Sequence, residues 1–450
     1  MTTPCYQPGC MAGSQVHGDP GAPRAFWQVN GNNGNVNNDN RNNRAFARPC
    51  RFVARPGECQ GEVPLQALYY AWRAARRAKR PSTDQMAFEA RWADELLALQ
   101  AELENGTWRP GRSTCFVALA PKARQIHAPP FRDRVVHHLI VPPMGAVWER
   151  LFIHDSYANR KGKGTHAAVE RVHAFARQVA SGQGGGWFLK LDIHNFFYSI
   201  DRRRLWAMLK PRLERAPVSR IVLQVAHALL RHPLEHHGII YQMRAEDLAH
   251  VPHHKRLENA APGCGLPIGN LPSQFFSNVY MNALDQFIKH ELRCRRYVRY
   301  VDDFVLVHRD RAVLAEWQLR IEAFLGQRLG LALKAEQQLR PLSSGIDFLG
   351  YGIFPTHVRV RRRVLTHARG ALRAWGAAHV DGETLCGTPA ELRLGQAIAA
   401  SYGGHFRHAN AHRLTHRLAR EFPWLSTLRS RPFRFHPDAE GRRVSVRMDA

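Results

Sequence analysis

Two adjacent aspartates, Asp302 and Asp303, interrupt the apolar stretch YVRYVDDFVLV. The residues on either side are β-branched or aromatic apart from Arg299 and Leu306, so the stretch predicts a β-hairpin with the acid pair at its tip. Two neighbouring carboxylates repel each other unless a cation lies between them. Asp also favours turns for reasons of backbone chemistry, and an ordinary turn explains the pair equally well when it is considered by itself.

A third acid, Asp192, follows the segment Trp187 to Leu191, which is apolar apart from Lys190 and predicts a carboxylate where a buried strand ends. Two-metal phosphoryl or nucleotidyl transfer requires carboxylates from separate elements that bridge the ions. We therefore predict that the three aspartates are catalytic and hold two Mg²⁺ ions, one to activate a primer 3′-hydroxyl and one to stabilise the departing pyrophosphate. The predicted metal-binding residues are Asp192, Ile193, Asp302 and Asp303.

The net charge indicates a polyanionic partner. The 450 residues carry 64 Lys and Arg against 37 Asp and Glu, a formal charge of +27. This excess favours nucleic acid, because no amphipathic membrane anchor is evident. A solubilising surface, or a GC-rich genome that favours Arg codons, is the alternative.

The sequence predicts a protein that is neither exported nor inserted in a membrane. No stretch approaches the ~20 apolar residues of a membrane span, and the first residues lack the pattern of a signal peptide. The eight cysteines include no C-x-x-C pair, so they predict neither a zinc site nor a disulfide framework. We therefore expect a reducing, cytoplasmic setting.

The elements that must position the acids indicate a mixed α+β fold built on an antiparallel sheet. Helices are expected over 62–79, where apolar residues recur at helical spacing, and over 84–106, with Asp84 as the N-cap. The tail from about residue 356 is expected to be helical and basic. Strands are expected in the segments 113–120, 185–193, 295–309 and 345–354.

Several motifs, in the expected order, resemble those of a reverse transcriptase. They are the D-x-x-x-F-F of Asp192 to Phe197, LPIGNLPSQ at 266–274 and YVDD at 300–303. The segments 124–140 and 156–168 look like fingers motifs, and GIDFLGY at 345–351 looks like the primer grip. The lysine that often precedes this grip aligns with Gln337, and Lys334 is close but offset.

The resemblance implies a right-hand polymerase fold. It places a segment of N-terminal helices and fingers at 51–186, a palm with a fingers insertion at 187–355 and a helical thumb at 356–450. It implies RNA-directed DNA polymerase activity, with template RNA, a primer or cDNA strand and deoxynucleoside triphosphates as partners. Phe197 matches the steric gate, since a large ring beneath the sugar leaves no room for a 2′-hydroxyl.

The resemblance also assigns residues to the substrates, because guanidinium and ammonium groups suit phosphate oxygens. For each of these cations, a solvated surface position is the alternative. The residues expected at the incoming nucleotide are Arg124, Arg132, Ile268, Gly269 and Gln274. The residues expected at the template backbone are Arg134, Arg160, Lys161 and Lys163.

The pattern I-G-N-x-x-S-Q at 268–274 is similar to that of reverse transcriptases from diversity-generating retroelements, which copy a template RNA with errors opposite adenines. Most other reverse transcriptases have Gln where this chain has Ile268. Ile neither donates nor accepts a hydrogen bond, so we hypothesise that the pocket loses one polar check on base-pair shape. Simple packing of Ile268 under a palm helix is the alternative.

That family implies a small basic helical accessory protein as a further partner. Two other interpretations stay open: a retron or group II intron-related reverse transcriptase, and a non-catalytic RNA-binding protein of the same fold.

The first 50 residues differ in composition from the rest. The segment NGNNGNVNNDNRNN at 30–43 has no hydrophobic period and predicts disorder. With the RAFARP that follows, it resembles the Asn-rich end of the variable, lectin-like proteins that these retroelements diversify. Asn codons are rich in adenine, so we hypothesise that residues from about 27 to 49 are a translated template repeat. An ordinary Asn-rich tail is the alternative.

Overall fold

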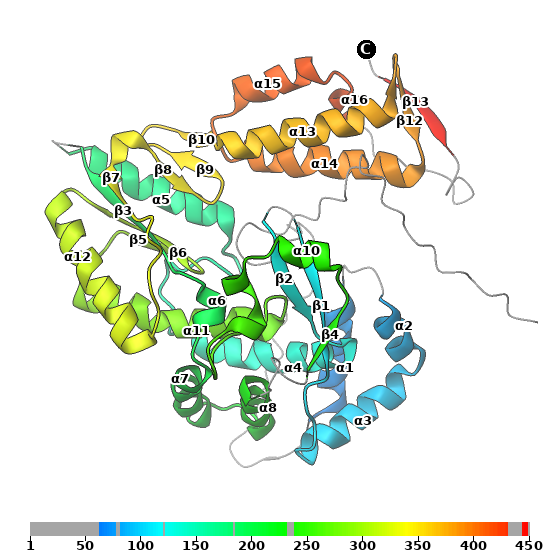
Figure 1. Ribbon diagram of the computed structural model, residues 1–450, viewed down its shortest axis with the longest axis vertical. Helices are drawn as coiled ribbons and strands as arrows, with labels where there is room; N and C mark the ends of the chain where they lie inside the picture. Colours follow the sequence, from blue (N-terminus) through cyan, green and yellow to red (C-terminus); the bar gives the residue numbers. More distant parts are fainter. Residues whose placement is uncertain are drawn as a thin grey trace, which may run out of the picture. The chain divides into compact units, whose positions relative to one another are not determined.

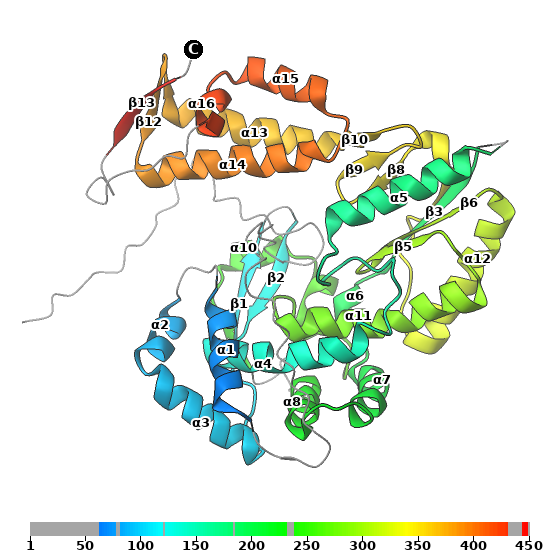
Figure 2. The same cartoon turned by 180° about the vertical axis from the view of Figure 1, so that it is seen from behind.

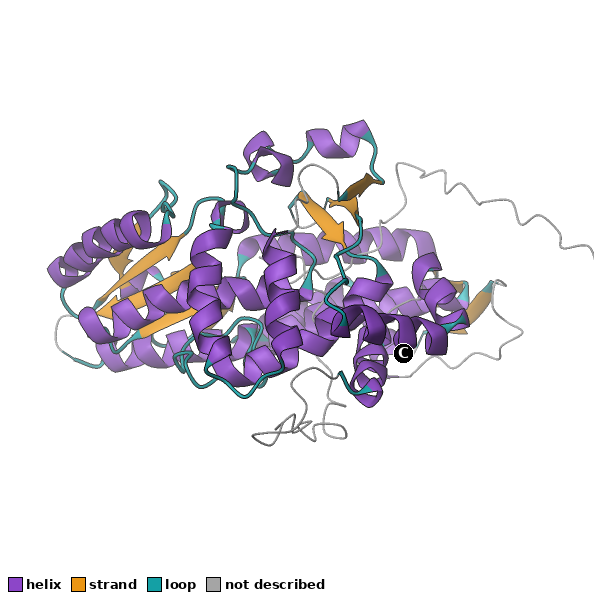
Figure 3. Ribbon diagram, turned by 90° about the horizontal axis from the view of Figure 1, so that it is seen from below, coloured by secondary structure: helices purple, strands orange, loops and turns teal. Residues whose placement is uncertain are grey.

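The computed structural model describes residues 63–77, 82–119, 122–182, 185–231, 238–430 and 443–448. Within these ranges the chain forms two compact units, shown in Figures 1 and 2: a larger one up to residue 364 with 405–412, and a smaller one of 365–404 and the described residues from 413 onward. The fold is mixed α+β, as predicted, with helices outnumbering strands (Figure 3). The predicted Asn-rich segment of 1–50 lies outside the described residues, and the boundaries of fingers, palm and thumb remain predictions.

Helices form the N-terminal part of the larger unit, where Leu68 and Trp72 are buried as their spacing predicts. The single helix expected over 84–106 is wrong, because Arg91 leaves the helical conformation, with φ of −133°, and divides it into two. The helices of this part are α1 (Leu65–Arg76), α2 (Thr83–Ala90), α3 (Trp92–Glu104) and α4 (Phe131–Trp148).

Asp84 does not have the predicted capping role. The N-cap position of α2 belongs to Ser82. The Asp84 carboxylate instead accepts a hydrogen bond from the Phe131 amide at 2.8 Å, which ties α2 to the first residue of α4. An Asp just before an apolar run predicts an N-cap, but the Asp84 side chain makes a contact with a residue 47 positions away, which the local sequence does not indicate.

A four-stranded antiparallel sheet, in the order β5-β6-β3-β7, carries the predicted acids. Helix α5 (Thr165–Ala180) packs on β5 and β6, and α12 (Arg311–Phe324) packs on β3, β6 and β7. The predicted hairpin is confirmed, because β5 and β6 are joined by a two-residue turn. The strands are β3 (Trp187–Asp192), β5 (Tyr297–Tyr300), β6 (Asp303–His308) and β7 (Gln338–Pro341).

Two small sheets complete the strands of the larger unit. In one, β1 pairs antiparallel with β2 and parallel with β4. In the other, β9 lies between β8 and β10. The strands are β1 (Ser113–Ala118), β2 (Arg124–Ala128), β4 (Ile239–Tyr241), β8 (Ile346–Phe348), β9 (Tyr351–Ile353) and β10 (Val358–Val360).

The long helix α11 (Leu271–Gln286) is almost entirely buried and packs against α4 and α7. It continues into a π-helical turn, Phe287–Glu291, and α12 continues into another, Leu325–Leu329. The remaining helices of the larger unit are α6 (Phe196–Ser199), α7 (Arg202–Glu214), α8 (Arg220–Arg231) and α10 (Ala245–Ala249).

The smaller unit is helical, as predicted for the tail, with a small sheet that the sequence did not indicate. Its core is built around Trp375, whose ring is fully buried and lies 4.9 Å from the Trp424 ring. Its elements are α13 (Arg362–His379), α14 (Pro389–Arg407), α15 (His412–Glu421), α16 (Leu425–Ser430), β11 (Val380–Asp381), β12 (Thr384–Gly387) and β13 (Val444–Arg447).

No helix in the described ranges combines the length and apolar character needed to cross a membrane.

Candidate active site

The turn between β5 and β6 presents the acid pair. Tyr300 pairs with Asp303, so Val301 and Asp302 are the two turn residues. Val301 has a φ of 59°, a left-handed conformation that is a true outlier for a β-branched residue. Apolar side chains on both strands are buried, and this burial fixes the register that places the two acids.

Asp192 lies directly opposite Asp303, because β3 and β6 pair antiparallel with these two residues in register. The structure therefore brings together all three predicted aspartates, two from the hairpin and one from the neighbouring strand. Burial, followed by repulsion from Asp192 and Asp303, raises the pKa of Asp302 to about 7. Burial also raises the pKa of Asp303 to about 6, although the Lys190 ammonium opposes that shift.

Two lysines that sequence reasoning did not assign to the site contact these carboxylates. The Lys334 ammonium is paired with Asp192 Oδ2, and Lys190 Nζ lies 3.4 Å from Asp303 Oδ2. Gln337, the residue that aligns with the family's lysine, bonds to Gln318, and the offset Lys334 is the lysine at the carboxylates. Lys190 was recognisable, since it is two residues before Asp192 on one strand and so shares its face.

The carboxylates fit a divalent cation by their chemistry. One oxygen of each aspartate, Oδ1, is buried without a hydrogen-bond partner. Three converging carboxylates with unpartnered oxygens are a hard-oxygen donor set of the kind that suits Mg²⁺. Ile193 is buried, so its backbone carbonyl is the only group it could offer. In the described chain, no three His, Cys, Asp or Glu side chains already enclose a metal position, and the two lysines lie against the carboxylates instead.

Phe197 and the loop 265–270 lie next to the sheet. Phe197 is on the short helix α6 and its carbonyl accepts a hydrogen bond from the Leu266 amide at 2.8 Å. The Ile268 carbonyl accepts one from the His127 amide of β2, also at 2.8 Å. Gly269 has a φ of 114°, and a Cβ there would meet Ile126 Cγ2 at 2.9 Å. Backbone contacts therefore join the predicted gate, the loop and β2.

Basic groups surround the acids. Burial lowers the pKa of Arg124, a predicted nucleotide-binding residue, and the Asp302 carboxylate opposes the shift. Burial and the charges of Lys334, Lys255 and Arg124 lower the pKa of Lys122. Lys122 stands two residues before Arg124, but the sequence offered no signal that distinguished it from other surface lysines.

The other predicted cations are mostly held by internal partners. Arg132 donates to both Glu102 oxygens at 2.8 Å, which ties α4 to α3. Arg134 bonds to the Pro129 carbonyl at 3.1 Å.

Two of the predicted cations of the basic turn 160–163 are also held by partners within the protein. Arg160 bonds to Glu149 and to the carbonyls of Ile153 and Ser156, and its side chain is only 6% exposed. Lys163 donates to the His154 carbonyl at 3.0 Å, whereas Lys161 is exposed. Gln274, predicted at the nucleotide, is buried within α11. Arg124 is thus the predicted cation that interacts electrostatically with Asp302, whereas Arg132 and Arg160 are paired with Glu102 and Glu149.

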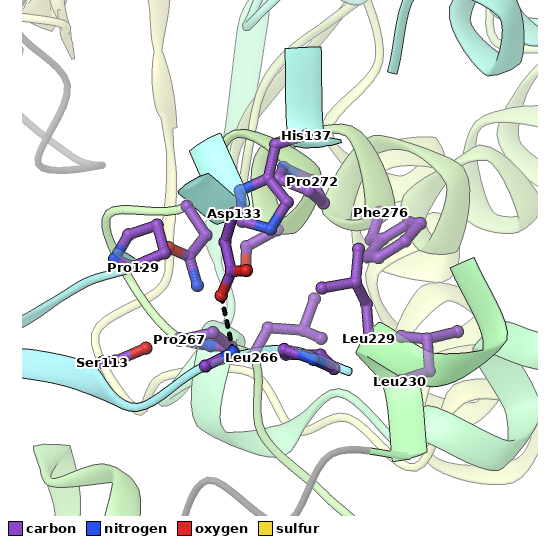
Figure 4. A pocket seen from close by; sticks show the side chains of 14 residues that line it. Ser113, Pro129, Asp133, His137, Leu229, Leu230, Leu266, Pro267, Pro272 and Phe276 are labelled. Atoms are coloured by element: carbon purple, nitrogen blue, oxygen red, sulfur yellow. Dashed lines mark hydrogen bonds between the residues drawn. The ribbon is translucent and has the colours of Figure 1, made fainter. Parts of the chain in front are cut away.

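A small cavity, lined by residues of the loop 265–270 and by none of the three aspartates, is shown in Figure 4. It leaves about 30 Å³ for water-sized molecules, and Asp133, His137 and Asn270 line it with apolar residues of α8 and α11. Asp133 Oδ2 accepts a hydrogen bond from the Gly111 amide at 2.7 Å. His137 Nε2 and Asn270 Oδ1 are buried without a protein partner, so one or two bound waters suit this space.

The chain is similar to several known proteins. The family model described as Reverse transcriptase (RNA-dependent DNA polymerase) matches residues 117–353, which include the loop 265–270 and all three aspartates. Protein YkfC of Escherichia coli (strain K12) is 24% identical over 235 residues, covering 51% of this chain and 55% of that protein. The group II intron-encoded protein LtrA of Lactococcus lactis subsp. cremoris is 21% identical over 383 residues, covering 70% and 57%. This chain spans about half the length of these curated relatives.

Among solved structures, a telomerase from Candida albicans in complex with a TWJ fragment of telomeric RNA superposes with a TM-score of 0.40 at 12% identity. The match covers 66% of this chain and 55% of that chain.

Proposed function

This chain belongs to the reverse transcriptase (RNA-dependent DNA polymerase) family, and we propose that it extends a DNA primer along an RNA template. One observation carries the proposal: Asp192 and Asp303 face each other across β3 and β6, with Asp302 in the adjoining turn. Each of the three keeps one buried carboxylate oxygen without a hydrogen-bond partner. Carboxylates that repel each other cost stability, and a cation-dependent reaction is a reason to keep them together.

Reverse transcriptases generally use a divalent metal, and we assign two Mg²⁺ ions to the carboxylates of Asp192, Asp302 and Asp303 with the carbonyl of Ile193. When bound, these ions supply the charge that stabilises the attacking and leaving oxygens of nucleotidyl transfer. Lys334 is paired with Asp192, within the same cluster. Arg124 adds a fixed positive charge for the triphosphate.

The Phe197 ring has the role of excluding a 2′-hydroxyl from the nucleotide pocket. The exposed Lys161, and the wider basic surface of the chain, have the role of holding the template backbone, since phosphate contacts need charge more than shape.

An Asp302→Asn variant tests the catalytic assignment. We expect magnesium-dependent primer extension on RNA to fall by about 100-fold or more, because one metal-holding oxygen loses its charge. RNA affinity should change by less than about three-fold, since phosphate contacts lie elsewhere. The matched control is Asp310→Asn, because Asp310 caps α12 and Asn caps a helix equally well.

Retained extension by Asp302→Asn would show that the acid cluster is not the polymerase centre. Absence of extension by the unaltered protein, with RNA binding intact, would favour a non-catalytic RNA-binding protein.

At a finer level we propose that the enzyme serves a diversity-generating retroelement and copies adenines with errors. The pattern I-G-N-x-x-S-Q supports this proposal, because the side chain of Ile268 offers no hydrogen-bonding group to a nascent base pair. A small basic accessory protein that presents the template RNA is part of the same proposal.

Replacement of Ile268 by Gln tests this finer proposal. We expect misincorporation opposite template adenine to fall more than misincorporation opposite the other bases, because Gln restores a polar check on pair geometry. Ile240→Gln, the same change on the exposed face of β4, is the control and should leave the error spectrum unaltered. An unaltered spectrum for Ile268→Gln as well would leave Ile268 as a packing residue.

A group II intron-related or retron enzyme is the second candidate, and the similarity to a group II intron-encoded protein favours the first of these. The DNA around the gene separates the candidates. A pair of near-repeats that differ mainly at adenines decides for the retroelement, and a flanking intron or structured retron RNA decides against it.

A further inference from the structure

Arg299 is a fully buried arginine two residues before the turn that carries the acid pair. Its side chain and that of Asp285 on α11 both have 0% exposure. All five of its N–H donors are used: Nε and Nη2 bond to the two Asp285 oxygens at 2.8 and 2.7 Å, and Nη2 also bonds to Ser156 Oγ at 3.0 Å. Nη1 bonds to Asn278 Oδ1 at 3.2 Å and to the Val301 carbonyl at 3.0 Å.

The bond to the Val301 carbonyl differs from the others because it ends on the turn itself. The other four bonds fix the guanidinium on α11 and on the segment before α5, and Asp285 is further held by the Tyr297 hydroxyl at 2.8 Å. The fifth bond fixes the peptide group that joins Val301 to Asp302. The orientation of this peptide determines where the Asp302 side chain begins.

That peptide needs an anchor because the turn is strained. A two-residue hairpin turn with positive φ at its first position is the type II′ geometry, in which Gly is usual. Val301, with φ of 59° and a side chain only 1% exposed, occupies that position. A β-branched residue relaxes readily from the left-handed region unless its surroundings hold it there.

We propose that Arg299 is a positioning residue that holds the strained Val301–Asp302 peptide and so aims the Asp302 and Asp303 carboxylates at the divalent cation. It touches neither substrate nor metal. Helix α11 anchors the guanidinium, and the guanidinium anchors the turn. The inference rests on the proposed polymerase function for its kinetic consequences, but the effect on cation binding stands by itself.

The test compares Arg299→Lys, Val301→Gly and the double variant. Lys keeps a positive charge for Asp285 but cannot reproduce the five-donor fork. We expect Arg299→Lys to lower kcat for primer extension by about ten-fold or more, with KM for the deoxynucleotide changed by less than about three-fold. Mn²⁺ binding, followed by the loss of the free-ion EPR signal, should weaken by about five-fold or more because the carboxylates are no longer aimed together.

Val301→Gly added to Arg299→Lys should restore most of both losses, because Gly adopts positive φ without cost and the turn no longer needs an anchor. If Arg299 only stabilised the fold, the double variant should be worse than Arg299→Lys, because Gly makes the turn more flexible and lowers stability further. The control is Ser156→Ala, which removes another bond of the same guanidinium and leaves the Val301 carbonyl alone. It should lower the melting temperature without changing kcat or Mn²⁺ affinity.

The proposal is overturned if Arg299→Lys keeps the Mn²⁺ affinity of the unaltered protein, or if Val301→Gly fails to restore it. If Arg299→Lys does not fold, Arg299→Gln combined with Asp285→Asn takes its place, since that pair leaves no unpaired buried charge. A protein that binds Mn²⁺ but extends no primer contradicts the proposed function alone, and the Mn²⁺ titrations still decide the role of Arg299.

Discussion

Asp133 shows how one buried carboxyl group can make stability depend on pH. It is 4% exposed beside the cavity of Figure 4, and burial raises its pKa to about 6 although the Gly111 amide opposes the shift. In the unfolded chain the same group has its ordinary value of 3.8. Between pH 3.8 and about pH 6, Asp133 keeps its proton in the folded chain but loses it in the unfolded chain. The stability of the fold therefore falls as pH rises through this range, and the stabilising contribution of the protonated Asp133 is lost above about pH 6.

We therefore predict that the free energy of unfolding of Asp133→Asn, compared with that of the unaltered protein at the same pH, is higher at pH 7 than at pH 4. The difference between the folded and unfolded pKa of Asp133 corresponds to about 3 kcal/mol of folding free energy. The Asn side-chain oxygen can still accept the hydrogen bond from the Gly111 amide. Urea unfolding of both proteins at pH 4, 5, 6 and 7 measures this difference in free energy. The contributions of the other acids that titrate in this range are common to both proteins and cancel. Parallel stability curves for the two proteins would show that Asp133 is not the group responsible.

Phe197 permits a prediction about substrate choice. Its ring is 7% exposed and packs edge-on against Phe196, with 5.3 Å between ring centroids. Phe197→Ala should reduce the preference for deoxyribonucleotides over ribonucleotides by about ten- to a hundred-fold, because it opens space beneath the sugar. Phe196→Ala removes the neighbouring ring and should lower stability with the preference intact. Equal preference in the Phe197 variant and the unaltered enzyme would place the gate elsewhere.

At the scale of elements, the contact between loop 265–270 and β2 depends on Gly269. With φ of 114°, any side chain there is strained, and its Cβ would lie 2.9 Å from Ile126 Cγ2 and 3.1 Å from the His127 carbonyl. Gly269→Ala should therefore destabilise the protein by about 1–3 kcal/mol and displace Ile268. Thermal unfolding measures the first effect and primer extension the second.

The control for Gly269 is Gly145→Ala in α4. A Cβ at Gly145 meets nothing within 4 Å, and Ala favours a helix, so this change should be neutral or stabilising by up to about 1 kcal/mol. Equal melting temperatures for the two variants would mean that the loop tolerates a side chain.

Elements whose signal is local could be predicted, and contacts between distant elements could not. The hairpin of β5 and β6 and the strand β3 follow from short apolar runs, which is why the three aspartates were found without a structure. The pairing of Arg132 with Glu102, 30 residues away, has no such signal, because the charge of Arg132 suits an acid and a phosphate equally. The break at Arg91 was missed since no Gly or Pro marks it.

For the whole molecule, the charge of +27 overstates the number of cations available to a nucleic acid. Hydrogen bonds within the protein, to carbonyl or carboxylate oxygens, engage the guanidinium groups of Arg134, Arg160 and Arg299. Composition predicts a polyanionic partner because it counts charges, but it cannot separate internal ion pairs from surface ones. The resemblance extends further than composition because it depends on the order of motifs along the chain.

The Asn-rich segment at 30–43, outside the described residues, leads to the last prediction. Because the segment shows no hydrophobic period, its sequence gives no reason to expect that primer extension depends on it. A protein without residues 1–50 should extend primers at a rate within about two-fold of the full chain. If the segment is a translated template repeat, the DNA that encodes residues 27 to 49 recurs near the gene, at the end of another reading frame, with differences concentrated at adenines. Sequencing of the locus shows whether this second copy exists. Without it, the adenine-rich codons reflect only an Asn-rich tail, and a large loss of activity on deletion would give that tail a role as protein.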